Sequence, residues 1–212
     1  MKKLAILALV LLAILFLGCS EEKVIVWDVD HKPVFPISHY SKLVGVLGGV
    51  VEGGVDDIGK ANAYVIAGVT KNFTAEEIDK IVDFVENGGK LVVLIHIPPT
   101  NVKPLLKKFG VNVSEKPYDV TEVLAVPGED NAITEGVREI YMRGVFPVDG
   151  NLFLIKKEKV IILGGDGRGV AKLVKFGRGE VLVFGDDAMF LNSYITKADN
   201  LKLAKNIAKW VN

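Results

Sequence analysis

Acidic and imidazole side chains follow three of the apolar runs that are typical of buried strands. In an open α/β sheet, ligands bind beyond the carboxyl ends of the parallel strands. Carboxylates and imidazoles gathered there could bind a small molecule, hold a divalent metal or transfer protons. We therefore predict a crevice that these side chains rim. They are Asp28, Asp30, His31, His96, Asp186 and Asp187.

Each of these residues also has a simpler structural interpretation. Asp28 could accept hydrogen bonds from neighbouring backbone amides, and Asp30 and His31 could order the loop that follows them. One of the two aspartates after the last run could cap a short helix over residues 188–191. His96 could simply end a strand. We expect such roles to account for more of these residues than binding does, and we assign no catalytic residue and no metal site.

Several kinds of chemistry have no support in the sequence. Cys19 is the only cysteine, which excludes a disulfide framework, a zinc finger and a papain-type nucleophile from the folded part. No Gly-x-Ser-x-Gly, His-x-x-x-His or Cys-x-x-Cys motif occurs. The glycine-rich run 164–169 precedes residues that alternate as in a strand, so it predicts a hairpin rather than a phosphate loop.

The first 22 residues form a membrane-targeting segment. Leu4 to Leu17 is an uninterrupted apolar run, shorter than the roughly 20 residues that span a bilayer but typical of a signal peptide. The tetrapeptide from Phe16 to Cys19 resembles the lipobox of secreted lipoproteins, in which the cysteine is lipidated. An uncleaved N-terminal anchor is the alternative. Both interpretations place residues 23–212 at the extracytoplasmic face of the cell membrane. The glycosylation sequons at Asn72 and Asn112 fit an exported protein, although two such triplets also arise by chance.

The charge balance argues against a nucleic-acid partner. The chain has 26 basic and 26 acidic residues. Loss of the segment before Cys19 removes Lys2, Lys3 and no acid, which leaves 24 basic and 26 acidic residues and a net charge of −2. A chain with so nearly equal numbers of basic and acidic residues has no strong positive electrostatic field that would attract a polyanion such as nucleic acid.

Residues 23–212 are expected to form one α/β domain. Its first half alternates predicted strands with predicted helices, which indicates a parallel sheet with helices on both faces. Thr74 and Glu77 form a capping box for the helix that ends at Gly88. Ser38 and Asp199 are predicted to cap the first and last helices. The predicted strands are 24–29, 63–67, 90–95, 121–126, 138–145, 152–155, 160–163, 170–176 and 181–184, and the helices are 38–47, 75–87, 101–109 and 199–211.

Three stretches carry a resemblance to a known superfamily. They are Trp27 to His31, Thr74 to Lys90, and Gly177 to Asn200. Their arrangement is similar to the non-catalytic branch of the class I glutamine-amidotransferase-like superfamily, and to an uncharacterised extracytoplasmic family related to a gliding-motility and ABC-transport auxiliary domain. The resemblance implies a flavodoxin-like three-layer sandwich with a mostly parallel sheet and an added antiparallel hairpin region in the C-terminal half. Asn192, within the third stretch, is a further candidate ligand-binding residue.

The sequence departs from the active members of that superfamily. Active glutamine amidotransferases place a nucleophilic cysteine just after a central strand, whereas residues 94–98 here read Leu-Ile-His-Ile-Pro. We therefore expect no glutaminase activity and no cofactor. The leading hypothesis is a non-enzymatic, membrane-tethered binding or accessory domain, with a transport system or another envelope protein as its partner. A metal-dependent hydrolase that uses the Asp/His cluster and a structural envelope protein are the alternatives.

Overall fold

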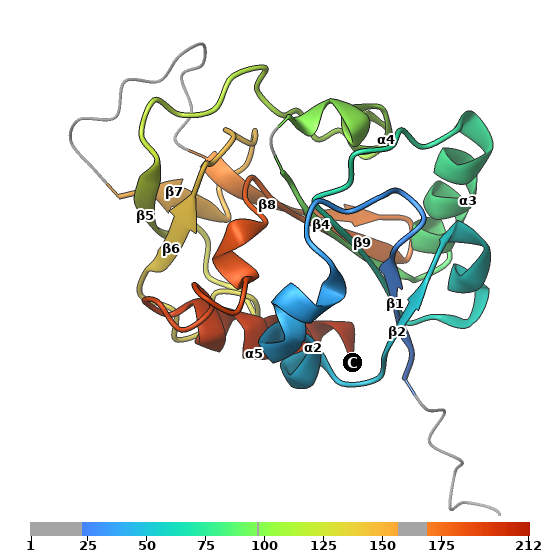
Figure 1. The fold of residues 1–212 in the computed structure, drawn as a ribbon, viewed down its shortest axis with the longest axis horizontal. Coiled ribbons are helices and arrows are strands. Elements are labelled where there is room, and N and C mark those ends of the chain that lie inside the picture. The colour runs from blue at the N-terminus through green and yellow to red at the C-terminus, as the bar shows by residue number, and fades with distance from the viewer. Residues whose placement is uncertain (1–22, 97, 157–168) are drawn as a thin grey trace, which may run out of the picture.

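A computed structural model describes residues 23–96, 98–156 and 169–212 of the chain. Within them, nine strands form one sheet in the order β2-β1-β3-β4-β9-β8-β7-β5-β6 (Figure 1). The leader with Cys19, the strand at 160–163 and the glycine run up to residue 168 lie outside the described residues, so these expectations stay predictions. No helix in the described part of the chain is long and apolar enough to cross a membrane.

Five strands at one end of the sheet are parallel. Each of β1, β3, β4 and β9 pairs in parallel with the strand before it in the sheet order. Of these strands, β1, β3, β4 and β9 are almost entirely buried and mainly apolar, as expected of parallel strands covered on both faces, whereas the edge strand β2 is partly exposed. Their bounds are Ile25–Asp28 for β1, Val50–Gly53 for β2, Ala63–Ala67 for β3, Lys90–Leu94 for β4 and Gly179–Phe184 for β9.

Four strands at the other end are antiparallel. Each of β8, β7, β5 and β6 runs opposite to the strand before it in the sheet order. The first of these pairs, β8 with β9, is a hairpin that turns at Gly177 and Arg178. The bounds are Glu122–Pro127 for β5, Ile140–Arg143 for β6, Phe153–Ile155 for β7 and Gly169–Phe176 for β8.

The expected fold class is therefore wrong. Four of the eight strand pairings are parallel and four are antiparallel, so the sheet is mixed rather than the mostly parallel sheet of a flavodoxin-like sandwich. The antiparallel strands are not an addition either, because they continue the same sheet and lead the chain back to β9. The reason is connectivity. A parallel neighbour needs a crossover, usually a helix, and between residues 109 and 199 the described residues contain no α-helix.

Four α-helices and four 3-10 turns are found in the described residues. The capping box at the start of α3 is confirmed: the Glu77 amide donates to Thr74 Oγ1, and the Thr74 amide donates to the Glu77 carboxylate. The α-helices are α2 (Ser41–Leu47), α3 (Ala75–Glu86), α4 (Lys103–Lys108) and α5 (Asn200–Val211). The 3-10 turns are η1 (Ile37–Tyr40), η2 (Val55–Lys60), η3 (Pro99–Asn101) and η4 (Ala188–Phe190).

Two predicted helix caps are absent, and one strand was not predicted. The chain at Ser38 forms the short turn η1, and α2 begins only at Ser41 without a side-chain cap. Asp199 is at the N-cap position of α5, but its carboxylate accepts from the Arg138 backbone instead of from the helix. The strand β2 was not predicted, because Val50 and Val51 continue an apolar run that begins in α2.

The parallel half is packed on both faces. Side chains that alternate along each strand enter two separate cores. One core lies against α2 and α5 and includes Trp27, Leu94 and Phe184. The other lies against η2, α3 and α4 and includes Val26 and Val93.

The two edges of the sheet differ. On its outer side, β2 pairs with no other strand of the described chain. The outer side of β6 is covered instead by side chains and one short bridge. The Asn200 amide pairs with both the N–H and the C=O of Tyr141, Asp186 accepts from the Arg143 N–H, and Ile140 bridges to Ala198.

Candidate functional site

Two His–Asp pairs lie at the carboxyl edge of the parallel strands, on opposite faces of the sheet. Asp28 follows Trp27 in β1 and therefore points to the face of α3, where His31 meets it. His96 lies two residues beyond Leu94 and joins Asp187 on the face of α2 and α5. Alternation along the strands separates the two pairs. The structure thus does not bring the six predicted residues into one crevice.

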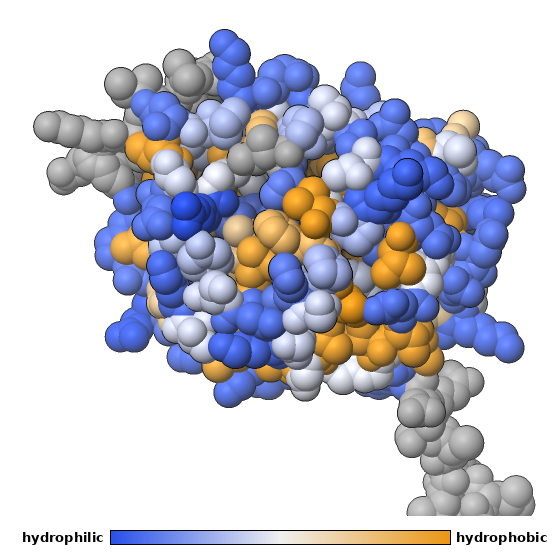
Figure 2. Space-filling model, in the orientation of Figure 1, coloured by the Kyte–Doolittle hydropathy of each residue, from blue (hydrophilic) through white to orange (hydrophobic). Residues whose placement is uncertain are grey.

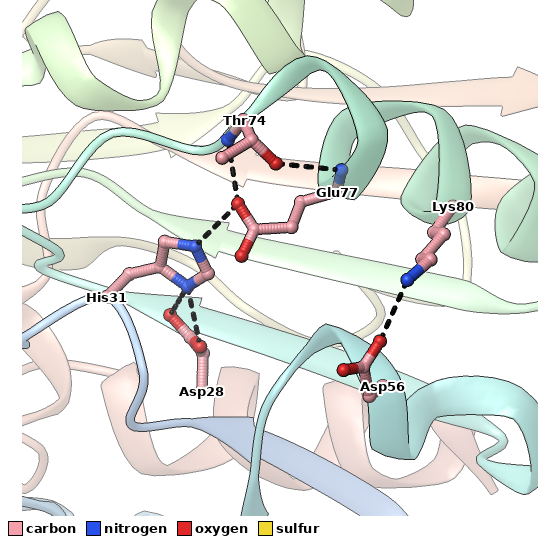
Figure 3. A network of polar contacts seen from close by, with 6 residues as sticks. All are labelled: Asp28, His31, Asp56, Thr74, Glu77 and Lys80. Carbon is pink, nitrogen blue, oxygen red and sulfur yellow. Dashed lines mark hydrogen bonds and ion pairs between the residues drawn. The ribbon is translucent and has the colours of Figure 1, made fainter.

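The first pair is sealed inside the protein. His31 Nδ1 lies 2.9 Å from a carboxylate oxygen of Asp28, and both side chains have no solvent exposure. His31 Nε2 lies 3.5 Å from the Glu77 carboxylate oxygen that also accepts from the Thr74 amide (Figure 3). The Phe73 ring stacks on the imidazole with the two centroids 3.7 Å apart. The imidazole is therefore hydrogen-bonded at Nδ1 and stacked on one face, while Nε2 makes no hydrogen bond and lies within ion-pair distance of Glu77.

The electrostatics of this cluster favour a charged imidazole. Burial lowers the pKa of His31, but the hydrogen bond and charge of Asp28, with a contribution from Glu77, outweigh burial and raise the pKa above its usual value. The Thr74 amide holds the pKa of Glu77 below its usual range. A buried cation between two carboxylates is a paired charge, and removal of one partner is costly. The cluster thus joins β1 to the first turn of α3.

The second pair opens to solvent. His96 Nδ1 lies 2.9 Å from an Asp187 carboxylate oxygen, and the imidazole is 25% exposed. Tyr40 donates its hydroxyl hydrogen to the same carboxylate at 3.0 Å. Gly68, at φ +58°, makes room for Asp187, because a Cβ there would lie 2.4 Å from the carboxylate. His96 Nε2 has no hydrogen-bond partner among the described residues, so this nitrogen is available to a ligand.

The hydrogen bond that His96 donates to the Asp187 carboxylate raises the pKa of His96, against the lowering effect of burial. The neighbouring carboxylate of Asp186 has a different role. It accepts from the backbone N–H groups of Arg143, Ala188 and Met189, and so caps the turn η4. Burial raises the pKa of Asp186 to about 8 despite these three donors. One of the two aspartates after the last strand therefore caps a turn, and the other orients His96.

A pocket of about 510 Å³ lies in front of the second pair. Pockets of this size are typical of small-molecule sites. Side chains from both halves of the sheet line it, since the chain after β6 returns to β9, where the Phe146 N–H donates to the Gly185 carbonyl. Arg143 enters the pocket from the end of β6 and donates to the Tyr194 hydroxyl at 2.7 Å. The lining also includes Phe35, His39, His96, Asp186, Asp187 and Ser193.

Two of the predicted ligand-binding residues lie elsewhere. Asp30 is exposed, and its carboxylate lies against the backbone of Gly54. Asn192 is engaged at the junction of η1 and α2, where its amide accepts from the Lys42 N–H and donates to the Ser38 carbonyl. The structure gives both residues structural contacts. Their role in binding stays a prediction.

No group of three or more His, Cys, Asp or Glu side chains in the described ranges is arranged to hold a metal ion. In the first cluster, the His31 imidazole lies between the carboxylates of Asp28 and Glu77. One metal ion therefore has no position from which it could contact both carboxylates. In the second, Asp186 is directed at backbone amides.

Sequence reasoning missed several residues of both clusters. Glu77 was predicted only as a capping residue, and nothing in its spacing indicates that its carboxylate also reaches His31. Tyr40 and Arg143 were missed because each meets the site through a contact between distant parts of the chain. Phe35 packs edge-on against His96 with the ring centroids 5.6 Å apart.

Comparison with known proteins gives a family and a fold. Residues 48–208 match the family described as a domain of unknown function, DUF4350. No curated protein sequence matches the chain. The fold is similar to the mmIFT52 N-terminal domain, with a TM-score of 0.68, 16% identity, and coverage of 89% of this chain and 97% of that one.

Two bacterial structures are also similar. The cytoplasmic protein STM1381 from Salmonella typhimurium LT2 has a TM-score of 0.61 at 14% identity, over 90% of this chain and 99% of that one. A thua-like protein from Bacteroides uniformis ATCC 8492 has a TM-score of 0.56 at 13% identity, over 89% and 90%. Identities this low show a shared fold alone. The resemblance to glutamine amidotransferases stays a prediction.

Proposed function

The chain belongs to the DUF4350 family, and from that premise we propose that it is a non-enzymatic, membrane-tethered domain that binds an anionic ligand at the extracytoplasmic face. One observation carries the binding site. Asp187 holds His96 by Nδ1, which leaves Nε2 without a protein partner at a pocket that Arg143 also lines. The tether rests on the apolar run and Cys19 in the leader.

The charges around the pocket favour an anion. Asp186 and Asp187 both line it, but their oxygens are engaged by backbone amides, Tyr40 and His96. The cationic groups at the pocket are the imidazole of His96 and the guanidinium of Arg143, both hydrogen-bond donors when charged. The guanidinium also donates to Tyr194 and lies 3.8 Å from the half-exposed Glu122 carboxylate, which leaves its other N–H groups to meet a ligand. A carboxylate or phosphate group can accept from both. Since the pKa of His96 is raised, its charge persists to a higher pH than that of an ordinary histidine.

The proposal is tested by thermal unfolding of the full chain in detergent with inorganic phosphate, citrate and a neutral sugar. An anion at 100 times its dissociation constant should stabilise the protein by about 2.7 kcal/mol. Since a hydrogen bond to a charged group contributes about 1.5–3 kcal/mol, His96→Ala and Arg143→Ala should each weaken binding by at least about tenfold. Arg138→Ala is the matched control, because Arg138 lines a different pocket and its side chain is 88% exposed.

The possible outcomes separate the hypotheses. Stronger binding of the neutral sugar would contradict the anionic ligand class. Absence of any shift, or equal binding by the His96→Ala variant, would exclude the pocket as the site and favour a structural role with an envelope protein partner.

The tether is tested independently by fractionation of cells that express the full chain. We expect the protein in the membrane fraction, accessible to protease from outside the cytoplasm. Cys19→Ser should abolish lipid labelling if the leader is a lipoprotein signal, and should leave membrane attachment intact if it is an uncleaved anchor. Recovery of the unaltered chain in the soluble cytoplasmic fraction would contradict the proposed location.

A further inference from the structure

One stretch of the described chain is apolar without interruption and lies partly at the surface. Residues 43–51 read Leu-Val-Gly-Val-Leu-Gly-Gly-Val-Val and run from α2 into the edge strand β2. Leu43 and Leu47 are buried in the core. The four valines of this stretch form what we call the valine surface: Val51 is exposed, whereas Val44, Val46 and Val50 are half-buried and pack with one side against the core.

The valine surface belongs to the open end of the sheet. Val50 and Val51 project from opposite faces of β2, yet both remain accessible because no strand covers the outer side of β2. Val51 is 46% exposed, the highest value among the large apolar side chains that are exposed in the described residues. Figure 2 shows apolar residues gathered on the lower right part of the molecule, in the region where Figure 1 places β2 and the end of α2. Apolar surface of this kind marks contacts with proteins or membranes.

The position of this surface relative to the N-terminal segment identifies its occupant. The Ile25 N–H donates to the Gly49 carbonyl at 2.9 Å. A Cβ at Gly49 would lie 2.2 Å from the Lys23 carbonyl oxygen, so the chain from the leader passes directly against the loop between α2 and β2. Only residues 18–22 separate Lys23 from the apolar run that ends at Leu17. Five residues span at most about 18 Å.

We propose that the valine surface rests on the lipid bilayer to which the leader attaches the domain. This inference rests on the tether of the proposed function. A tether this short keeps the α2–β2 loop within reach of the headgroup region, where uncharged valine side chains can enter the boundary between headgroups and acyl chains. The carboxyl-edge pocket is at the opposite end of the strands from residue 23, so it faces away from the bilayer.

The test uses the full chain in vesicles of phosphatidylcholine and phosphatidylglycerol in which the phosphatidylcholine is brominated on its acyl chains. Bromine quenches tryptophan fluorescence at short range, so Val51→Trp reports contact with lipid. Leu124→Trp is the matched control, since Leu124 is 38% exposed on β5 in the antiparallel half. We expect the added emission of Val51→Trp to be quenched, as for a side chain at the boundary between headgroups and acyl chains. The emission of Leu124→Trp should be unchanged.

The two native tryptophans are measured in the parent chain and subtracted, and Val46→Trp provides a second reporter on α2 if Val51→Trp does not fold. Equal quenching of Val51→Trp and Leu124→Trp, in chains that are still attached to the vesicles, would overturn the inference. It would not contradict the proposed tether. Failure of the chain to sediment with the vesicles would overturn both. A blue-shifted Val51→Trp emission without quenching, in a chain of twice the expected mass, would show that a second copy covers the surface.

Discussion

The two His–Asp pairs share their chemistry and the sheet edge on which they lie, but they differ in what surrounds them. His31 has no exposure and is surrounded by Asp28, Glu77 and Phe73. His96 is 25% exposed, has one nitrogen without a protein partner, and lines a pocket. The same pair of side chains therefore stabilises the fold in one place and can bind a ligand in the other. The second carboxylate at His31 makes the difference, since it approaches the nitrogen that His96 leaves free.

The largest expected effect tests the sealed pair. Asp28→Ala leaves a buried imidazole without its main partner, which should lower the free energy of unfolding by about 3–5 kcal/mol. Urea denaturation of the purified chain measures this. Asp30→Ala is the control two residues away, and its exposed side chain predicts a change within about 0.5 kcal/mol. Similar losses in the two variants would show that the sealed cluster is not a stabilising ion pair.

The open pair should contribute less to stability. His96→Ala removes a partly exposed imidazole, and Asp187 keeps its hydrogen bond from Tyr40. We expect a loss of about 1–2 kcal/mol by urea denaturation, the cost of a buried polar group that loses one partner. A loss equal to that of Asp28→Ala would remove the contrast between the two pairs.

The dependence of stability on pH sharpens the comparison. Folding raises the pKa of both His31 and His96, so each contributes stability that is fully present below about pH 6.5 and is lost as the pH rises through the folded-state value. Asp186, with a pKa raised to about 8, also binds a proton more tightly when folded, so its contribution falls from about pH 4 up to about pH 8. Each group changes the stability by less than about 1.4 kcal/mol per pH unit.

Denaturation from pH 6 to 9 should therefore show stability decreasing as the pH rises. The decrease should be less steep in His96→Ala, which retains only the contributions of His31 and Asp186. A rise in stability over this range would contradict the raised pKa values.

The smallest expected effect concerns the helix start that carries Glu77 to His31. Thr74→Ala removes the oxygen that accepts from the Glu77 amide. Loss of such a cap costs typically about 1 kcal/mol, which lowers the unfolding temperature by roughly 2–4 °C in a domain of this size. Calorimetry measures the shift. A change as large as that of Asp28→Ala would mean that the cap, rather than Asp28, holds the sealed pair together.

The sequence predicts local features of this protein better than distant ones. The capping box at Thr74 and the turn after Asp186 follow from hydrogen bonds between residues two or three positions apart. The separation of His31 from His96 could not be predicted. The strands before them are apolar on both faces, so alternation alone does not say which side chains share a face. The mixed sheet was missed because the local pattern of β5 to β8 indicates strands without indicating their partners.

The covered edge of β6 has a consequence for solubility. Exposed strand edges are templates for pairing between molecules, and natural proteins protect them. Asn200 supplies both a donor and an acceptor to Tyr141, and so occupies the place of a neighbouring strand. With this edge blocked, β2 is the sheet edge that stays open to intermolecular pairing among the strands of the described residues. Association of the domain should therefore begin at β2, and Asn200→Ala alone should not add a second pairing edge, because Asp186 and the bridge between Ile140 and Ala198 still cover β6.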